Sequence, residues 1–140
     1  MPKQLYPCLW FDGNAKAAAD FYCSVFKNSQ IISDIPMVVT FELNGTRFMG
    51  LNGGPMFKFT EAVSFVVECE NQGEIDYYWN KLTEGGEESQ CGWLKDKFGV
   101  SWQIIPAILE ELMSDPEKSQ RIFQALMPMK KIEIEKLINA

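Results

Sequence analysis

Two segments of the chain share one pattern of apolar and capping residues at a separation of 57 positions. Asn14 matches Asn71, and the apolar positions of a helix follow each asparagine. The other matched pairs are Leu9 with Val66, Ala18 with Ile75, Phe21 with Tyr78, Tyr22 with Trp79 and Val25 with Leu82. A fixed period of this length indicates a repeated supersecondary unit. The sequence therefore predicts two similar modules, at about 4–54 and 62–106.

Each module has the pattern of one strand, one helix and three further strands, which predicts an α+β fold made of two tandem βαβββ modules. Asn44-Gly45 lies between two strand-like runs and predicts a tight hairpin. Asn71 and Glu74 have the spacing of a capping box, and Gly85-Gly86 is typical of a helix end. A module of this kind forms a four-stranded sheet with a helix on one face. Two modules side by side would enclose a concave cavity.

A different pattern begins after Pro106. Apolar residues at helical spacing predict a helical tail over 107–140, with Asp115-Pro116 expected to start its second helix. A chain of 140 residues has the length of one domain, so we expect the modules and the tail to form a single domain over 1–140.

Histidine is absent from the sequence. This excludes catalytic triads and dyads that use His, as well as His-based zinc sites. The four cysteines form no CxxC pair, and we expect Cys91 to be a packed thiol. A metal site would need carboxylates, thiolates, amides or water.

The chain carries 19 acidic and 13 basic residues, for a formal charge of −6. A net negative charge disfavours nucleic acids and anionic membranes as partners. The N-terminal segment lacks the pattern of a signal peptide, and no run of 18 apolar residues occurs. We therefore expect a cytoplasmic protein with reduced thiols.

Several short motifs resemble those of one known family. The motifs are Leu9–Ala15, Phe21–Phe26, Leu51–Pro55, Ser64–Val67, Cys91–Gly99 and Ser101–Ile104. Together they resemble the PhnB-like branch of the vicinal oxygen chelate superfamily, also called the glyoxalase/bleomycin-resistance superfamily. This branch is often labelled 3-demethylubiquinone-9 3-methyltransferase-like. The resemblance extends over nearly the whole chain, tail included, and implies a glyoxalase fold with a curved sheet around a cavity, and a homodimer.

The residues at the superfamily's metal positions differ from the metal-binding pattern. Metal-dependent relatives carry a His early in the first strand of each module and a Glu late in the last strand. The corresponding positions here are about Leu5, Ala62 and Gln103, which are poor ligands for a divalent metal. A methyl donor is usually held by a glycine-rich turn between a strand and a helix, and neither Gly53-Gly54 nor Gly85-Gly86 has that context. We therefore expect no metal and no cofactor.

Three polar residues on predicted strands are candidate ligand-binding residues. Strand alternation places Ser64, Ser101 and Gln103 on the cavity side, while Trp102 faces a helix. The same rule places Leu9 on the cavity side of its strand. A buried polar group costs free energy unless it is hydrogen-bonded. These side chains would therefore either line a wet pocket or bond one another and the backbone, and the sequence leaves both open.

Three further ligand-binding candidates lie outside this group. Asn52 could orient a ligand or form a turn before Gly53-Gly54, and Trp93 and Phe57 could form an apolar wall or pack elsewhere. The charged segment 95–97 is expected to be a solvated face. The other three tryptophans, Trp10, Trp79 and Trp102, are expected in the core.

These observations favour a metal-free homodimer that binds a small molecule of unknown identity. One alternative is a metal-independent enzyme, and another is the methyltransferase activity that the resemblance implies. A third is an interaction module whose tail binds a partner or the other subunit. Catalytic residues are not identified by the sequence.

Overall fold

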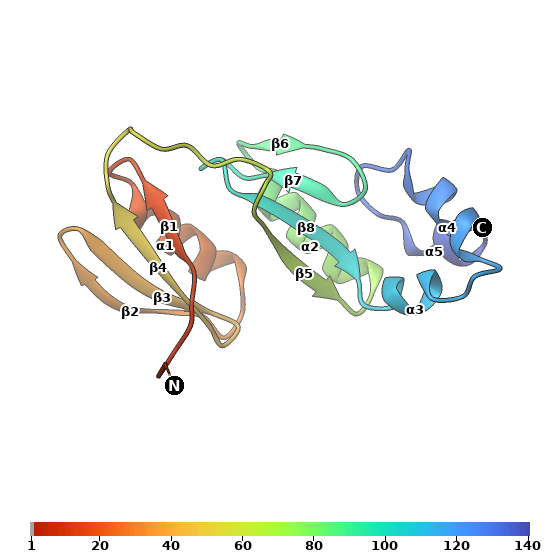
Figure 1. Ribbon diagram of the computed structural model, residues 1–140, viewed down its shortest axis with the longest axis horizontal. Coiled ribbons are helices and arrows are strands. Elements are labelled where there is room, and N and C mark those ends of the chain that lie inside the picture. Colours follow the sequence, from red (N-terminus) through yellow and green to blue (C-terminus); the bar gives the residue numbers. More distant parts are fainter. Residues whose placement is uncertain (1) are drawn as a thin grey trace. The chain divides into compact units, whose positions relative to one another are not determined.

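The computed structural model describes residues 2–140 and divides the chain into two compact units, Met1–Phe59 and Thr60–Ala140 (Figure 1). Each unit contains one of the two modules, and the second unit also contains the tail. Within residues 2–140, none of the helices combines the length and the apolar character needed to cross a membrane.

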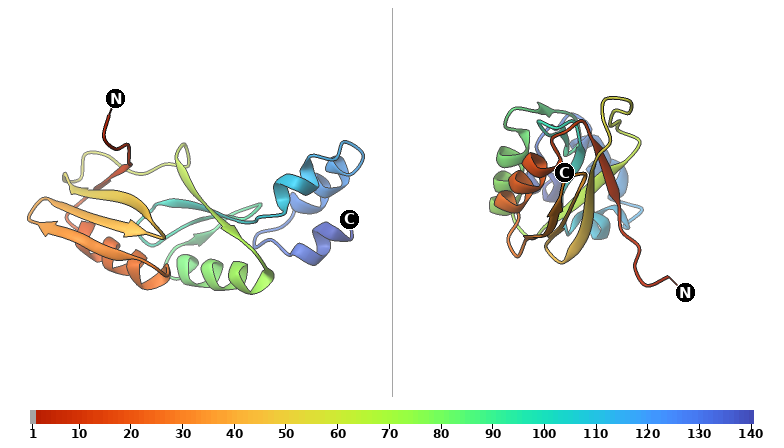
Figure 2. Two further views of the ribbon diagram at one scale, coloured as in Figure 1. Left: turned by 90° about the horizontal axis from the view of Figure 1, so that it is seen from below. Right: turned by 90° about the vertical axis from the view of Figure 1, so that its left-hand side faces the viewer.

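The first unit is a four-stranded sheet with one helix on one face (Figure 2, left). Its elements are β1 (Cys8–Phe11), α1 (Ala15–Val25), β2 (Gln30–Ile35), β3 (Val38–Leu43) and β4 (Thr46–Asn52). The strand order is β1-β4-β3-β2, in which β1 is parallel to β4 and the other pairs are antiparallel. The Asn44-Gly45 hairpin is confirmed, since both residues have positive φ, 50° and 85°.

Aromatic rings fill the space between α1 and this sheet. The Tyr22 ring lies 6.1 Å from the Phe41 ring, which stacks 5.5 Å from Phe48. All three side chains are buried, and burial of such a side chain contributes about 1.5–3 kcal/mol. Small residues on α1, among them Ala15 and Ala18, let the helix approach the sheet closely.

The predicted orientation of the first strand is wrong. Leu9 and Phe11 are buried on the α1 side, whereas Cys8 is exposed and Trp10 is half-buried on the opposite face. Gly13, with φ 82°, is part of a turn that is one residue longer than the turn before the second helix. That extra residue shifts the alternation by one position, so the gapless repeat holds for the helices but not for the first strands.

The second unit repeats this topology with different details. Its module contains β5 (Ser64–Cys69), α2 (Gln72–Thr83), β6 (Glu87–Glu88), β7 (Trp93–Lys95) and β8 (Ser101–Pro106). The strand order is β5-β8-β7-β6, with β5 parallel to β8. The two βαβββ modules are thus confirmed, and their strands form two open four-stranded sheets rather than one continuous sheet.

The N-terminus of α2 has the expected cap. Asn71 Oδ1 accepts a hydrogen bond from the Glu74 amide at 2.9 Å, and the Glu74 carboxylate accepts one from the Glu70 amide at 2.7 Å. The first bond satisfies an amide of the first helical turn, and the second satisfies the amide of the residue before the cap. At the other end, Gly85 has φ 75° and closes the helix region as predicted.

The tail forms three short helices and packs on the module of the second unit. They are α3 (Leu109–Met113), α4 (Ser119–Leu126) and α5 (Ile134–Ile138). The expected start of α4 is wrong by several residues, because Asp115 Oδ1 accepts from the Glu117 amide and forms a turn before the helix. The buried cluster of the tail comprises Ile122, Leu126, Met129, Ile132 and Leu137.

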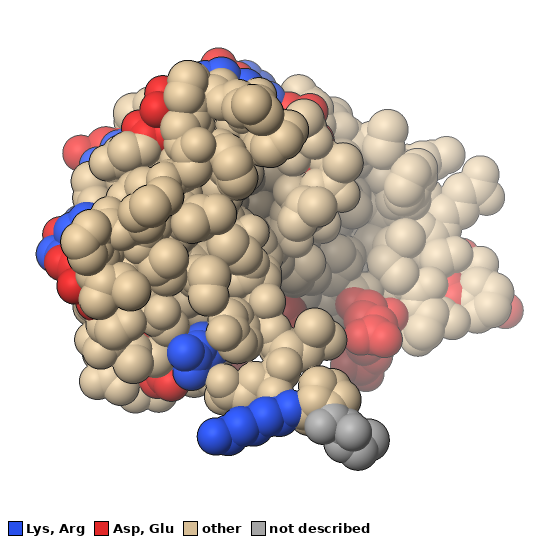
Figure 3. Space-filling view, turned by 60° about the vertical axis from the view of Figure 1, so that its left-hand side comes forward, with Lys and Arg blue, Asp and Glu red and all other residues tan. Residues whose placement is uncertain are grey.

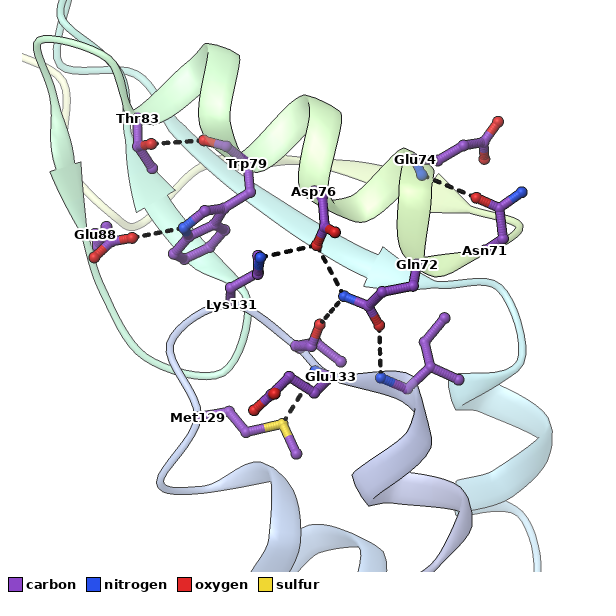
Figure 4. Close-up of polar contacts among 12 residues, drawn as sticks. Asn71, Gln72, Glu74, Asp76, Trp79, Thr83, Glu88, Met129, Lys131 and Glu133 are labelled. Atoms are coloured by element: carbon purple, nitrogen blue, oxygen red, sulfur yellow. Dashed lines mark hydrogen bonds and ion pairs between the residues drawn. The ribbon is translucent and has the colours of Figure 1, made fainter.

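One glutamine on α2 anchors the tail (Figure 4). Gln72 Nε2 donates to the Ile132 carbonyl at 2.9 Å, and Gln72 Oε1 accepts from the Ile134 amide at 2.8 Å. An ion pair between Lys131 and Asp76, 2.9 Å long, lies beside these bonds. The tail also pairs with the loop before β7, where the amides of Cys91 and Gly92 donate to tail carbonyls at 2.7 and 2.8 Å.

Candidate functional site

The face of the second sheet opposite α2 carries the polar residues singled out in the sequence. The strand register places Ser64 beside Ser101, and Ser101 beside Lys95. One step along the strands, Gln103 lies beside Trp93. Phe65, Trp102 and Ile104 alternate with these residues, and Trp102 and Ile104 are buried on the α2 side, as predicted. The helix-free face of β5, β8 and β7 is therefore a polar strip bordered by Trp93.

Two of the three polar candidates bond each other. Gln103 Nε2 donates to Ser64 Oγ at 3.0 Å, across the parallel β5–β8 pair. Both side chains are half-buried. This pair matches the alternative in which the polar residues satisfy one another.

Ser101 is different. Its side chain is 1% exposed, and its Oγ has no hydrogen-bond partner among residues 2–140. The only other such buried atom in the described residues is Nε of Arg47, whose Nη1 donates to Gln4 Oε1 at 3.1 Å. An unpaired buried hydroxyl costs about 1–3 kcal/mol. Ser101 therefore has an unused hydrogen-bonding capacity at the floor of this face.

A small cavity of about 190 Å³ lies at this position. Its walls come from the loop before β5, from β6 and β7, and from the start of β8. The lining residues are Glu61, Glu87, Glu88, Ser89, Trp93, Leu94, Lys95 and Ser101. Two of the predicted residues, Ser101 and Trp93, thus share one cavity wall, and we call this space the Ser101 cavity.

An ion pair between Lys95 and Glu61 crosses the rim of the Ser101 cavity. The hydrogen bond to Glu61 raises the pKa of Lys95 above its ordinary value, and the same bond lowers the pKa of Glu61. Both groups are therefore charged at neutral pH. Glu87 lies opposite Lys95 in the β6–β7 pair and adds a second negative charge near the lysine.

The expectation that residues 95–97 form a solvated face is wrong for Asp96, which is 3% exposed. Its carboxylate accepts hydrogen bonds from the amides of Phe98 and Val100 and from Trp102 Nε1, at 2.8, 3.1 and 2.8 Å. Asp96 thus ties the β7–β8 turn to the core and fixes the start of β8, where Ser101 lies. A single Asp before Lys-Phe-Gly has the appearance of an ordinary turn residue, so the sequence did not reveal this role.

Asn52 and Phe57 belong to the first unit. Asn52 Oδ1 accepts from the Ala15 amide at 2.9 Å, at the N-terminus of α1. Asn14, the expected cap, makes no side-chain cap bond to α1 within the described residues. Phe57 is 58% exposed and packs edge-on against Trp10, with ring centres 4.8 Å apart.

The glycine pairs serve packing rather than ligand binding. Gly53 lies against the Trp10 ring, whose Nε1 donates to the Gly54 carbonyl at 2.8 Å. At Gly86, a side chain would collide with the backbone of Lys95 and Asp96. Gly53-Gly54 follows β4 and is not followed by a helix, and Gly85-Gly86 lies between α2 and β6, so neither pair is the strand-to-helix turn that holds a nucleotide-like methyl donor.

The cysteines are free thiols. Cys91 packs against the tail, where its Sγ lies 3.6 Å from the Leu126 carbonyl, in line with the predicted packed thiol. Burial raises the pKa of Cys69 to about 12, so this thiol stays protonated at neutral pH. Within residues 2–140, no three Cys, Asp or Glu side chains gather in a way that could hold a metal ion.

Comparison with known proteins identifies the family. The family model described as 3-demethylubiquinone-9 3-methyltransferase matches residues 3–105. The chain belongs to this family. A solved structure described as a putative 3-demethylubiquinone-9 3-methyltransferase, PhnB protein, from Bacillus cereus is 35% identical, with a TM-score of 0.69. The match covers 75% of this chain and 100% of the Bacillus cereus chain.

Two solved structures with lower sequence identity share the fold of the present chain. Protein PA1353 from Pseudomonas aeruginosa is 20% identical with a TM-score of 0.62, over 75% of this chain and 98% of that one. The fosfomycin resistance protein FosX from Listeria monocytogenes, solved with Mn(II) and sulfate, is 18% identical with a TM-score of 0.60. That match covers 81% of this chain and 97% of the FosX chain. These matches confirm the glyoxalase fold. A search of the curated proteins finds no match.

The family match ends before the tail. Residue 105 is the last matched position, so the helical tail lies outside the region that defines the family. The expectation that the resemblance extends through the tail is therefore not met by the family model.

Proposed function

We propose that this protein is a homodimer that binds a small organic molecule on the helix-free face of its second sheet, without a resident metal. The observation that carries the proposal is the buried Ser101 hydroxyl, which lines a cavity and has no partner within residues 2–140. A ligand group that hydrogen-bonds to Ser101 would remove the cost of this unpaired atom. Trp93 offers the flat apolar surface that small-molecule sites use.

The dimer is supported by apolar side chains that the described chain leaves uncovered. Val66 lies on the helix-free face of the second sheet and is 53% exposed, and Ile35 and Met37 on the first unit are exposed as well. In the view of Figure 3, the surface of the first unit carries few charged side chains over its middle part. Exposed apolar surface of this kind marks interaction sites.

The proposed metal independence follows from the residues at the superfamily's metal positions. The side chains of Leu5 and Ala62 offer no ligand atom, and Gln103 offers only a neutral amide oxygen. A neutral amide is a weak ligand compared with a carboxylate. No step of the proposed function depends on a metal.

Binding is favoured over acid–base catalysis by the state of the ionisable groups. The pKa of Glu61 is lowered and that of Lys95 is raised by their mutual bond. A general base or acid works best with a pKa near the working pH, and this ion pair moves both groups away from it. Methyl transfer, which the family description names, would need a donor site other than the two glycine pairs.

Native mass spectrometry of protein purified gently from its own host tests the proposal. We expect the mass of two chains plus a small organic molecule, and we expect Ser101→Ala to lose that molecule while Ser119→Ala, on α4, retains it. A retained divalent metal would overturn the metal-free part of the proposal. A bare single chain would overturn the dimer, and loss of the molecule in both variants would overturn the assigned site.

A further inference from the structure

The rim of the Ser101 cavity carries more negative than positive charge. Three of its lining residues are glutamates, and Lys95 is its only cationic residue in the described chain. Lys95 is already paired with Glu61, and Glu88 accepts a hydrogen bond from Trp79 Nε1 at 2.7 Å (Figure 4). The Glu87 carboxylate has no hydrogen-bond or ion-pair partner among residues 2–140 and is exposed. One carboxylate at this rim is therefore available to a ligand.

The charge surplus coincides with an independent sign of a ligand. Ser101 is 1% exposed, lines the same cavity and leaves its Oγ unpaired within the described residues. Trp93 lines the cavity too, and the face of an indole attracts cations. An acceptor oxygen, a carboxylate and an aromatic ring are thus gathered at one small space.

These features select one class of ligand. An anion would meet the carboxylates of Glu61 and Glu87 and a lysine that is already paired, while the Glu88 carboxylate bonds Trp79. A divalent metal would need at least three suitable side chains in a cluster, and residues 2–140 contain no such group. An organic ammonium group has three N–H donors, which suit a carboxylate and a hydroxyl oxygen together.

We propose that the Ser101 cavity binds small primary ammonium compounds, an inference that rests on the proposed ligand-binding function and specifies its ligand. The ammonium group donates to the Glu87 carboxylate and to Ser101 Oγ. The apolar part of the ligand lies against Trp93. Lys95 lowers the affinity of this site for an ammonium group, because its positive charge offsets part of the negative field that attracts the ligand.

Three compounds that share one aromatic scaffold test the inference. Benzylamine, benzyl alcohol and benzoate differ in charge but little in size, and their Kd values would be measured by calorimetry on the full chain. The residues that respond would be mapped by NMR. We expect benzylamine to bind about tenfold more tightly than benzyl alcohol, in line with the extra strength of a charge-assisted hydrogen bond. Benzoate should bind more weakly still.

The outcomes separate this inference from the function on which it rests. If benzyl alcohol or benzoate binds at Trp93 and Ser101 as tightly as benzylamine, the ligand class is wrong and the binding face stands. If none of the three compounds shifts these residues, both proposals are overturned at this cavity.

Two charge variants should move the benzylamine Kd in opposite directions. Glu87→Gln removes the available carboxylate and should weaken binding about tenfold. Lys95→Met removes the competing positive charge and should strengthen binding severalfold. Glu84→Gln, which changes an exposed glutamate at the end of α2 outside the cavity, is the matched control and should leave Kd unchanged. Equal weakening by Glu87→Gln and Glu84→Gln would show that only net charge matters and would overturn the assigned role of Glu87.

Discussion

Ser64 and Ser101 are direct neighbours across the parallel β5–β8 pair, yet only Ser64 has a hydrogen-bond partner within residues 2–140. This difference predicts that serine-to-alanine substitutions at the two positions change the free energy of unfolding in opposite directions. Ser101→Ala removes an unpaired buried hydroxyl and should raise the free energy of unfolding of the ligand-free protein by about 1 kcal/mol. Ser64→Ala leaves the Gln103 amide without its acceptor and should lower the free energy of unfolding by about 1 kcal/mol. Urea unfolding of both variants measures the effects, and a destabilising Ser101→Ala would show that this hydroxyl has a protein partner.

The cap of α1 comes from the end of β4 rather than from the residue before the helix. Asn52→Ala should lower the free energy of unfolding by about 1 kcal/mol, because the Ala15 amide loses its acceptor. Asn14→Ala should cost less, since the Asn14 side chain makes no cap bond among the described residues. Chemical unfolding of the two variants side by side provides the measurement. A larger loss in Asn14→Ala would contradict this assignment.

Gly92 is a point where the second sheet and the tail meet. A Cβ there would lie 2.7 Å from the Ile104 carbonyl oxygen and 2.8 Å from Ile132 Cδ1, at a φ of 85°. Gly92→Ala should therefore lower the free energy of unfolding by more than the roughly 1–2 kcal/mol that the left-handed backbone conformation alone would cost. Gly13→Ala, at φ 82° with nothing within 4 Å, measures that strain by itself. Equal losses of thermal stability in the two variants would show that the tail yields to the added methyl group.

The ion pair between Asp76 and Lys131 predicts a pH dependence of tail docking. Hydrogen bonds from Lys131 and Gln72 lower the pKa of Asp76 below its ordinary 3.8 in the folded protein. The stabilisation is therefore complete above pH 3.8 and is lost as the pH falls through the lower folded value. The pair is partly exposed, so we expect less than about 1 kcal/mol. Asp76→Asn should be less stable than the parent at pH 7, and the gap should be smaller at pH 2. A gap that is the same at both pH values would contradict the ion pair.

The helices and turns could be predicted because local rules determine them. The Asn44-Gly45 turn, the Asn71 cap and the end of α2 at Gly85 each depend on the conformation or the hydrogen bonding of a few neighbouring residues. The orientation of Ser101 and Gln103 followed from strand alternation, and the register confirms it.

The features that were missed depend on contacts or turn lengths that local sequence patterns do not specify. Asn52 caps a helix that begins 37 positions earlier, and Asp96 bonds the indole of Trp102 across a turn. The one-residue turn extension at Gly13 reversed the orientation of Leu9, because strand alternation changes with every inserted residue. The sequence did not predict the ion pair between Lys95 and Glu61, since it joins a strand to a loop 34 positions away.

The central claim, that the helix-free face of the second sheet binds a small molecule, is tested most directly by an NMR screen of small organic compounds against the 140-residue chain. We predict that the compounds that bind shift the signals of the Trp93 indole, the Ser101 amide and the Gln103 side-chain amide. We also predict that Ser101→Ala raises the Kd of these compounds. Another groove lies between α2 and the tail, and Gln72, Lys131 and Asn139 are among its lining residues. Compounds that shift only the signals of that groove, or that leave every signal of the helix-free face unchanged, would contradict the claim.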